Sequence, residues 1–446
     1  MLRRPTRHLA TIVAALAFGV AATPAHAAPD PMLDQQWGLE QVATGAPEAW
    51  TQSHGAGVLV AILDSGVQLN HPDLASNLWR NPNEIAGNNI DDDRNGYVDD
   101  VNGANIKELN GNVEDDNGHG THVAGIVAAQ AGNGVGGSGI APDAKIMAVK
   151  VLDANRSGDS SRLAKGIVYA VDRGAKILNV SINGDGTSGD LDAALRYAGS
   201  KGATVVASAG NNARDIDVTP SYPASSPEPA VFVATATEPT GTLISIANRG
   251  VRSIDLAAPG GSILSTARGG GFELRQGTSM AAPFVAGSLA LLASARPDLP
   301  QSVLRDALAQ SAPRPTLLSG LLGGGALNVA AALHRVLPGA LWKDNPTQDV
   351  ALPLDDAQPT LEVSSKSRVR KGRSATVRWT ATGAVRVVQW RVSLNGKRLK
   401  TLPGTKTVLR KKVNKAGTHR WKVVGLDAEG QTVVTATRKF TVVKAR

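Results

Sequence analysis

Four short segments of the chain contain the side chains that nucleophilic catalysis requires. Asp64 follows an apolar run in Leu-Asp-Ser-Gly, His119 lies in Asn-Gly-His-Gly-Thr-His, and Ser279 lies in Gly-Thr-Ser-Met-Ala-Ala-Pro. A serine hydroxyl becomes nucleophilic when an imidazole takes its proton, and a carboxylate can fix the tautomer of that imidazole. Asn211, in Ser-Ala-Gly-Asn, adds an amide suited to bind an oxyanion. Together these residues indicate acyl transfer at a serine.

Each of these side chains also has a non-catalytic interpretation when it is taken alone. Ser279 precedes an apolar helical stretch and fits a helix N-cap, Asp64 fits a turn at a strand end, and Asn211 fits a left-handed turn. His119 or His122 fits a packed or capping imidazole. The occurrence of all four segments in this order favours the catalytic interpretation. A serine at a helix N-terminus also lies beside free N–H groups that stabilise an oxyanion.

The motifs Asp-Ser-Gly, His-Gly-Thr-His and Gly-Thr-Ser-Met-Ala-Ala-Pro resemble those of the subtilisin-like serine peptidases, the subtilase family, over residues 33–335. The order Asp, His, Ser is that of subtilisin. The resemblance implies that Asp64 orients the imidazole, His119 is general base and then general acid, and Ser279 attacks the scissile carbonyl. It further implies that the Asn211 amide and the Ser279 N–H form the oxyanion hole. His122 is assigned to packing.

The same resemblance suggests where an extended peptide would bind. Arg156, Ser157 and Gly158 would pair with the substrate backbone as an added strand. Ser181, Ile182 and Asn183 would line the pocket for the side chain that precedes the cleaved bond. The family usually has glycine at the position assigned to Asn183, whose amide could narrow the pocket, although a shift of the alignment by one residue explains the difference equally well. The sequence therefore predicts no side-chain preference.

An acidic segment, residues 91–100, has the composition of a site for a hard cation. Carboxylates and an amide alternate before a glycine turn, as in the first half of an EF-hand loop. The expected ligands are Asp91, Asp93, Asn95, Asp99 and Asp100. The alternative is a solvated acidic turn, because the glutamate of a full EF-hand is missing. Since calcium commonly stabilises members of the family, we expect Ca²⁺ as a structural cofactor, with Asp73 in His-Pro-Asp-Leu as a further ligand.

The segments between these motifs predict an α/β fold, a doubly wound and mostly parallel sheet. Continuous apolar strands are expected at 57–63, 145–152, 175–181 and 203–209, and helical periodicity occurs over 162–173 and 190–201. A buried helix is expected from Ser279 to about residue 294, followed by another helix to about residue 311, and residues 325–333 are expected to close the domain. Ligands of such sheets bind at the carboxyl ends of the strands, where Asp64, Ser181 and Asn211 would lie.

The N-terminal residues 1–27 have the pattern of a signal peptide, with Arg3, Arg4 and Arg7 before an apolar run and Ala-His-Ala at its end. We therefore expect a secreted, extracellular protein. The chain has no cysteine, which excludes thiol catalysis and thiolate metal sites. The catalytic domain would begin close to the cleavage site, so it is expected to fold without a long propeptide or with help from the C-terminal domain.

The C-terminal part differs from the rest in charge and pattern. Residues 338–359 predict a linker, and residues 361–446 predict an all-β sandwich of immunoglobulin or fibronectin type, with a hairpin at Asn395-Gly396 and three tryptophans in its core. From residue 345 onward there are 22 Lys and Arg against 6 Asp and Glu, whereas the preceding part has 25 against 32.

This basic domain suggests a partner of opposite charge. Anionic cell-wall polymers, membrane surfaces or acidic proteins would fit, whereas nucleic acid is poorly motivated outside the cell; a solvated strand face explains the charge equally well. We expect a monomeric serine endopeptidase that acts on proteins or peptides. The competing hypothesis is a catalytically silent binding protein that acts through the basic domain.

Overall fold

The computed structural model describes residues 29–337, 360–365, 368–382, 389–403, 408–426 and 432–443. The expected signal peptide and linker lie outside these ranges. The N-terminal part opens with short helices before the first strand. They are η1 (Leu33–Gln35), η2 (Trp37–Leu39) and α1 (Ala46–Trp50).

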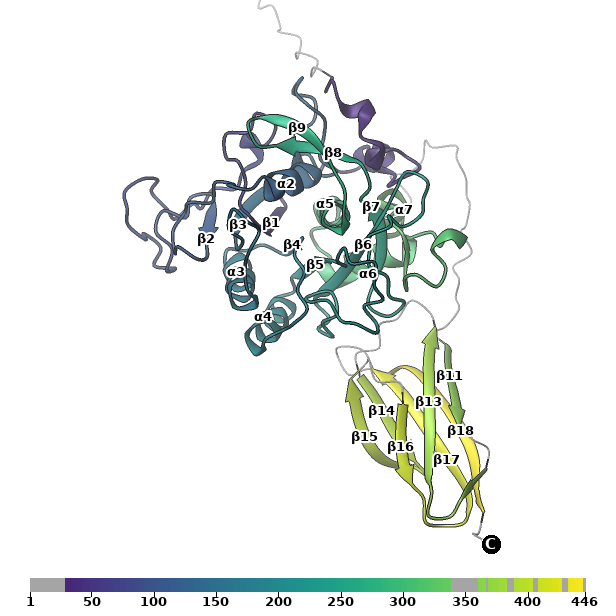
Figure 1. The fold of residues 1–446 in the computed structure, drawn as a ribbon. Coiled ribbons are helices and arrows are strands. Elements are labelled where there is room, and N and C mark those ends of the chain that lie inside the picture. The colour runs from purple at the N-terminus through teal and green to yellow at the C-terminus, as the bar shows by residue number, and fades with distance from the viewer. Residues whose placement is uncertain are drawn as a thin grey trace, which may run out of the picture.

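An eight-stranded parallel sheet forms the centre of residues 29–337 (Figure 1). The strands are β1 (Leu59–Asp64), β2 (Gly103–Asn105), β3 (Lys145–Lys150), β4 (Ile177–Val180), β5 (Thr204–Ser208), β6 (Val231–Thr237), β7 (Leu256–Pro259) and β10 (Gly325–Ala326). Their order in the sheet is β10-β7-β6-β5-β4-β1-β3-β2, and every neighbouring pair is parallel. This confirms the predicted doubly wound α/β class.

Helices cover both faces of the sheet, which explains why its strands are apolar throughout. Along β1, Val60 and Ile62 belong to one hydrophobic core, whereas Ala61 and Leu63 belong to the other. The first core contains residues of α2 (His119–Ala128), α5 (Thr278–Ala295), α6 (Gln301–Ser311) and α7 (Val329–Val336). The second contains residues of α3 (Ser160–Asp172) and α4 (Gly189–Ser200). Two short helices, η3 (Ala75–Asn77) and η4 (Thr316–Leu318), complete the set.

The chain reverses its direction of winding at β1. From β1 it builds β2 and β3 on one side, then returns past β1 to add β4, β5, β6 and β7 on the other. Ligand sites of open parallel sheets lie at such a switch point, outside the carboxyl ends of the strands. Asp64 ends β1, and β4 and β5 are the next two strands in the sheet.

Helix α5 is the core helix of the first face and packs against α2, α6, α7 and five strands of the sheet. Among the described residues it is the one helix long and apolar enough to suit a membrane span as well, and 83% of its 18 residues are buried within the fold. An antiparallel hairpin of β8 (Ile263–Ala267) and β9 (Gly271–Arg275) leads into it and lies over α2 (Figure 1).

The C-terminal strands form two sheets around a separate core, which agrees with the predicted sandwich. One sheet contains β11 (Thr360–Ser365), β13 (Ser374–Thr382) and β16 (Val408–Lys412), and the other contains β12 (Arg368–Arg370), β18 (Thr432–Val443), β17 (Gly417–Leu426), β14 (Gln389–Leu394) and β15 (Lys397–Pro403). Asn395 and Gly396 both have positive φ, 52° and 82°, as a tight hairpin between β14 and β15 requires. Trp379, Trp390 and Trp421 are buried in this core, as expected.

Candidate active site

Asp64 and His119 form a buried pair at the carboxyl edge of the sheet. Asp64 is the last residue of β1, and His119 is the first residue of α2. The His119 Nδ1 lies 2.8 Å and 2.9 Å from the two carboxylate oxygens of Asp64, and the two residues are 3% and 0% exposed. Because a carboxylate only accepts hydrogen bonds, Nδ1 carries the proton. Nε2 is therefore the nitrogen available to take a proton from another group.

Asp115, which the sequence reasoning missed, holds the loop that delivers His119. Its carboxylate is buried and accepts hydrogen bonds from the N–H groups of Gly118 (2.8 Å) and Thr121 (2.9 Å) and from the Ser65 hydroxyl (2.9 Å). Burial alone would raise the pKa of Asp115, but the hydrogen bonds from Gly118 and Thr121 outweigh it and lower the pKa. An acidic residue just before the His-Gly-Thr-His motif was the available signal.

Lys150 is a second residue that the sequence reasoning missed. It ends β3, pairs in register with Asp64, and is 8% exposed. Its ammonium donates to the Ser65 carbonyl and to the Asp116 carboxylate, the latter at 2.7 Å. It therefore joins the end of β1 to the loop that precedes His119.

Ser279 lies at the N-terminus of α5, where the helix leaves N–H groups unpaired. Its hydroxyl donates to the Ser181 carbonyl at 3.2 Å, and the Ser181 hydroxyl donates to the Ser279 carbonyl at 2.9 Å. Val180, just before Ser181, pairs in register with Leu63, just before Asp64. Since neighbouring strands lie about 4.8 Å apart, this register places Ser181, and with it the hydrogen-bonded Ser279, next to Asp64.

The hydroxyl of Ser279 is not yet engaged with the imidazole. Within residues 29–337 no hydrogen bond joins Ser279 to His119. Catalytic hydrogen bonds in ligand-free enzymes are often long and shorten only when substrate binds. A rotation of the Ser279 side chain away from the Ser181 carbonyl would release the hydroxyl.

Asn211 presents its amide to the same region. The Thr278 N–H donates to its Oδ1 at 2.9 Å, and the Thr278 hydroxyl donates to the same oxygen at 3.2 Å. A backbone N–H can only donate, so the opposite half of the amide is the NH₂ group, on an exposed side chain. Gly277, with φ at 143°, leaves room for it, because a Cβ there would lie 3.2 Å from Asn211 Nδ2.

The expected substrate-binding residues lie on two loops beyond β3 and β4. Arg156, Ser157 and Gly158 are exposed in a loop that the Asp153 carboxylate closes by accepting the Ser157 N–H at 2.9 Å. After β4, the Asn183 amide donates to the Ser208 carbonyl at 2.6 Å and accepts from the Ser208 hydroxyl at 3.0 Å. Both ends of the Asn183 amide are thus tied to the end of β5, next to the segment that carries Asn211.

His122, one helical turn after His119, contacts the β8–β9 hairpin. Its Nε2 is 3.1 Å from the carbonyl oxygens of Ile263 and Glu273, on the two strands of the β8–β9 hairpin. Burial lowers the pKa of His122 to about 3, so the imidazole is neutral near neutral pH. Its position fits the packing role expected for it.

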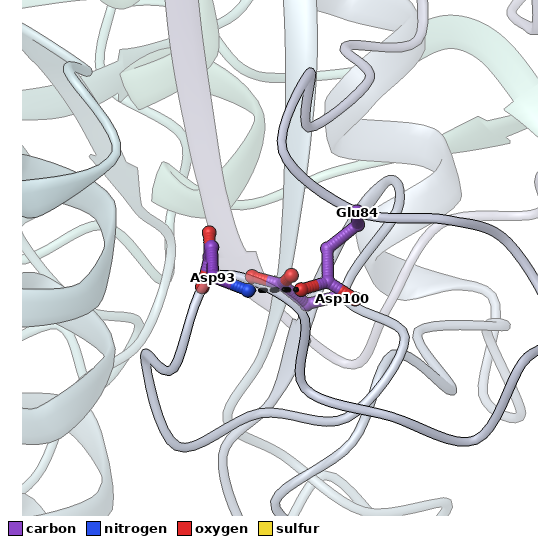
Figure 2. A group of neighbouring side chains, drawn as sticks. All are labelled: Glu84, Asp93 and Asp100. Atoms are coloured by element: carbon purple, nitrogen blue, oxygen red, sulfur yellow. Dashed lines mark hydrogen bonds between the residues drawn. The ribbon is translucent and has the colours of Figure 1, made fainter.

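The acidic segment separates into two groups of side chains. Asp93 and Asp100 converge with Glu84, and one ligand oxygen from each lies within 4.8 Å of the others (Figure 2). Asn95 joins this cluster by donating to Asp100 at 2.9 Å. By contrast, the carboxylates of the second group accept backbone N–H groups of the loop. Those bound by Asp91 come from residues 95 and 96, and those bound by Asp99 come from residues 87–89.

The cluster of Glu84, Asp93 and Asp100 fits a cation chemically. Oε2 of Glu84 is buried without a hydrogen-bond partner among the described residues. Burial raises the pKa of Asp100, although hydrogen bonds from Tyr169 and Asn81 oppose the shift. Arg173 already pairs with Asp93, which neutralises part of the negative charge. Glu84 was not predicted, because it precedes the acidic segment and no spacing rule links the two.

Asp73 lies apart from this cluster. Its side chain is fully buried; Oδ1 accepts from the Asn133 amide at 2.7 Å, and Oδ2 has no hydrogen-bond partner among the described residues. Burial raises the pKa of Asp73 to about 7, and the nearby negative charge of Asp30 adds to the shift. A buried, unpartnered carboxylate oxygen beside a second carboxylate also fits a cation.

The site is assembled along the chain in the order of the subtilisin class of serine endopeptidases, with the aspartate on β1, the histidine on α2 and the serine on the core helix α5. The Subtilase family profile matches residues 55–346, well over half of the chain. The chain therefore belongs to the subtilase family and is a serine endopeptidase.

Individual relatives agree with this assignment. Thermitase of Thermoactinomyces vulgaris is 39% identical over 260 residues, which cover 58% of this chain and 82% of thermitase. A thermophilic serine proteinase of Bacillus sp. (strain AK1) is 38% identical over 247 residues, 55% of each chain. Among solved structures, a protease of Pseudoalteromonas arctica PAMC 21717 superimposes with a TM-score of 0.58 at 28% identity, covering 69% of this chain and 99% of that one.

Proposed function

We propose that the protein is a secreted endopeptidase that hydrolyses peptide bonds through Asp64, His119, Ser279 and an acyl-enzyme intermediate. The buried contact of His119 Nδ1 with both oxygens of Asp64 carries the proposal, because it fixes the tautomer that leaves Nε2 as a base. Ser279 lies at the N-terminus of the long core helix α5, next to the end of β4, the strand that pairs with β1. That helix favours negative charge at its N-terminus.

The chemical steps follow from these positions. His119 Nε2 takes the Ser279 proton as Oγ attacks the substrate carbonyl, and the oxyanion that forms is bound by Asn211 Nδ2 and the Ser279 N–H. The imidazolium then protonates the leaving amine, and the C–N bond breaks to leave an ester on Ser279. Water, deprotonated by His119, attacks the ester, which releases the acid and restores the serine. Asp64 stabilises the imidazolium in both halves.

Substrate binding in this proposal uses the two loops beyond β3 and β4. The exposed segment of Arg156, Ser157 and Gly158 pairs with an extended peptide, and Ser181, Ile182 and Asn183 line the pocket for the side chain before the cleaved bond. Asn183 is fixed by its two hydrogen bonds to Ser208. Its amide therefore stays in place when substrate enters.

Calcium is the proposed structural cofactor. The cluster of Glu84, Asp93, Asn95 and Asp100 would hold one ion and Asp73 another, and the ions would neutralise carboxylates that burial destabilises. In this proposal Asp91 and Asp99 shape the acidic loop, because their oxygens accept its backbone N–H groups. The buried oxygens of Glu84 and Asp73 support the proposal.

Secretion and surface attachment are proposed from the ends of the chain. The signal-like residues 1–27 support an extracellular enzyme. We take it to be a monomer that acts on proteins or peptides. In the described part of the C-terminal domain, 17 Lys and Arg stand against Glu362 as the one acidic residue, which supports attachment to an anionic cell-wall polymer or surface. Binding of the full chain to teichoic acid should weaken as the salt concentration rises. Binding that does not change with salt concentration would count against this role.

The catalytic proposal is tested by labelling the mature protein with a fluorophosphonate probe, which reacts with activated serines. Wild type should be labelled and Ser279→Ala should not. Absence of labelling in folded, calcium-loaded wild type would favour the competing hypothesis of a silent binding protein.

A further inference from the structure

One buried side chain supports the segment that presents Asn211. Asn211 itself is exposed, in the loop that follows β5. Asn248, far along the chain between β6 and β7, is 0% exposed and lies against this loop. Its side chain and backbone both contact the loop, so the position of Asn211 depends on a residue outside the catalytic motifs.

The hydrogen bonds of Asn248 bracket Asn211 on both sides. Before Asn211, the Asn248 Nδ2 donates to the Ala209 carbonyl at 2.8 Å, and the Asn248 N–H donates to the Gly210 carbonyl at 2.9 Å. After Asn211, the Asn248 Oδ1 accepts the N–H groups of Asn212 and Arg214 at 3.0 Å and 3.1 Å. The NH₂ group and the oxygen of the Asn248 side-chain amide therefore both form hydrogen bonds with the loop that carries Asn211.

The packing around Asn248 leaves little room for a different arrangement of the loop that carries Asn211. Gly210 has φ at 102°, and a Cβ at this position would come within 2.4 Å of Asn248 Nδ2. The Asn248 carbonyl is fixed in turn, because it accepts the Thr235 hydroxyl at 2.7 Å. Thr235 belongs to β6, so the contact connects the oxyanion loop to the sheet.

We propose that Asn248 is a positioning residue of the oxyanion hole, which acts on catalysis by fixing the backbone on either side of Asn211. The inference rests on the proposed function of Asn211. Thr278 fixes the orientation of the Asn211 amide, and Asn248 fixes the place from which that amide extends. A donor displaced by about 1 Å loses on the order of 10²-fold in rate.

The test is a double-mutant cycle of Asn248→Ala and Asn211→Ala, with kcat and KM measured on a peptide amide substrate. Asn248→Ala alone should lower kcat by about tenfold to a hundredfold and leave KM within about twofold. In the Asn211→Ala background the same change should cost less than about threefold, because the donor it positions is already missing. Active-site titration with the fluorophosphonate probe corrects each value for the folded fraction.

Asn77→Ala is the matched control. Asn77 is a buried asparagine whose amide also donates to two backbone carbonyls, those of Ala128 and Pro142, away from the oxyanion loop. It should lower Tm without lowering kcat. If Asn248→Ala does not fold, Asn248→Asp keeps the acceptor for Asn212 and Arg214 and replaces the donor to Ala209 by an oxygen that repels its carbonyl, and it should show the same non-additivity.

Two results would overturn the inference. One is an unchanged kcat in the folded Asn248 variants. The other is a loss that multiplies fully with that of Asn211→Ala, which would indicate a general structural role. A failure of the proposed function is distinguishable from both, because it would appear as the absence of wild-type turnover or as an Asn211→Ala variant that is as active as wild type.

Discussion

At the scale of single residues, the aspartate–histidine pair has the burial and geometry that the proposed general base requires. Asp64 is fully buried, and its carboxylate lies against a single imidazole nitrogen and the Ser65 N–H. An amide at position 64 would keep the shape but would present an NH₂ group to one side of Nδ1. His119 would then be free to adopt the wrong tautomer.

We therefore predict that Asp64→Asn lowers kcat by about 10⁴-fold with little change in KM. Steady-state kinetics on a peptide amide substrate measure the loss, and the thermal melt confirms that the variant is folded. A loss of less than about tenfold would contradict the role of Asp64.

Asn183 carries a prediction about specificity. Its amide is held between β4 and the end of β5 and occupies space that a glycine would leave open. Asn183→Gly should raise kcat/KM for substrates with a large aromatic side chain before the cleaved bond by about tenfold, relative to substrates with alanine there. Asn183→Ala, which removes the amide but keeps Cβ, should fall between. Equal effects on both substrates would place Asn183 outside the pocket.

At the scale of elements, His122 connects α2 to the β8–β9 hairpin and makes the contact sensitive to acid. The pKa of His122 is about 3 when folded against an ordinary value of 6.5, so the unfolded chain binds more protons between these values. The stability that His122 contributes is complete above pH 6.5 and is lost as pH falls toward 3.

The prediction is that His122→Gln is less stable than wild type at pH 7 but loses less stability on acidification. The slope of the unfolding free energy against pH, between 6.5 and 4, should be smaller in the variant, and urea unfolding at several pH values measures it. Parallel curves for the two proteins would show that His122 does not titrate on unfolding.

The elements that the sequence predicted best are those with long, continuous patterns. The apolar runs that became β1, β3, β4 and β5 were evident because strands buried on both faces carry apolar residues throughout. β6, Val231–Thr237, carried a similar signal that was overlooked. β2 and β10 have three and two residues, too few for any period, and depend on their neighbours in the sheet.

At the same scale, the sequence predicted the candidate site in part. Short local motifs contain Asp64, His119, Asn211 and Ser279. The residues that support the oxyanion loop and complete the carboxylate cluster lie outside such motifs. Asn248 lies in a loop that approaches Asn211 only in the folded sheet, and Glu84 reaches Asp93 and Asp100 from an upstream loop. Such contacts arise from tertiary structure, so no spacing within one segment reveals them.

At the scale of the whole molecule, the protein has no disulfide bonds, and its stability depends on how the charges of its buried carboxylates are compensated. The catalytic part must keep several carboxylates close together, and the proposed binding of cations to the folded state would stabilise it by mass action. At a calcium concentration of 100 times Kd, the gain is about 2.7 kcal/mol. For a domain of this size, that corresponds to a shift in Tm of about 4 °C.

Chelation of calcium should therefore lower Tm by several degrees, and Glu84→Gln should reduce this response. Asp99→Asn is the matched control, because the Asp99 carboxylate accepts backbone N–H groups outside the cluster; it should lower Tm but keep the calcium response. Thermal melts with EDTA and with added Ca²⁺ measure both. A Tm that does not respond to chelation would exclude calcium as a stabiliser.

The activation of Ser279 can be tested by locating a fluorophosphonate adduct by mass spectrometry after tryptic digestion. The peptide that contains Ser279 runs from Gln276 to Arg305, because trypsin does not cleave the bond between Arg296 and Pro297. We predict one adduct per molecule on Ser279 of wild type, and none on this peptide in His119→Ala, because the serine then lacks its base. An adduct on another residue, or equal labelling of Ser279 without His119, would contradict this prediction.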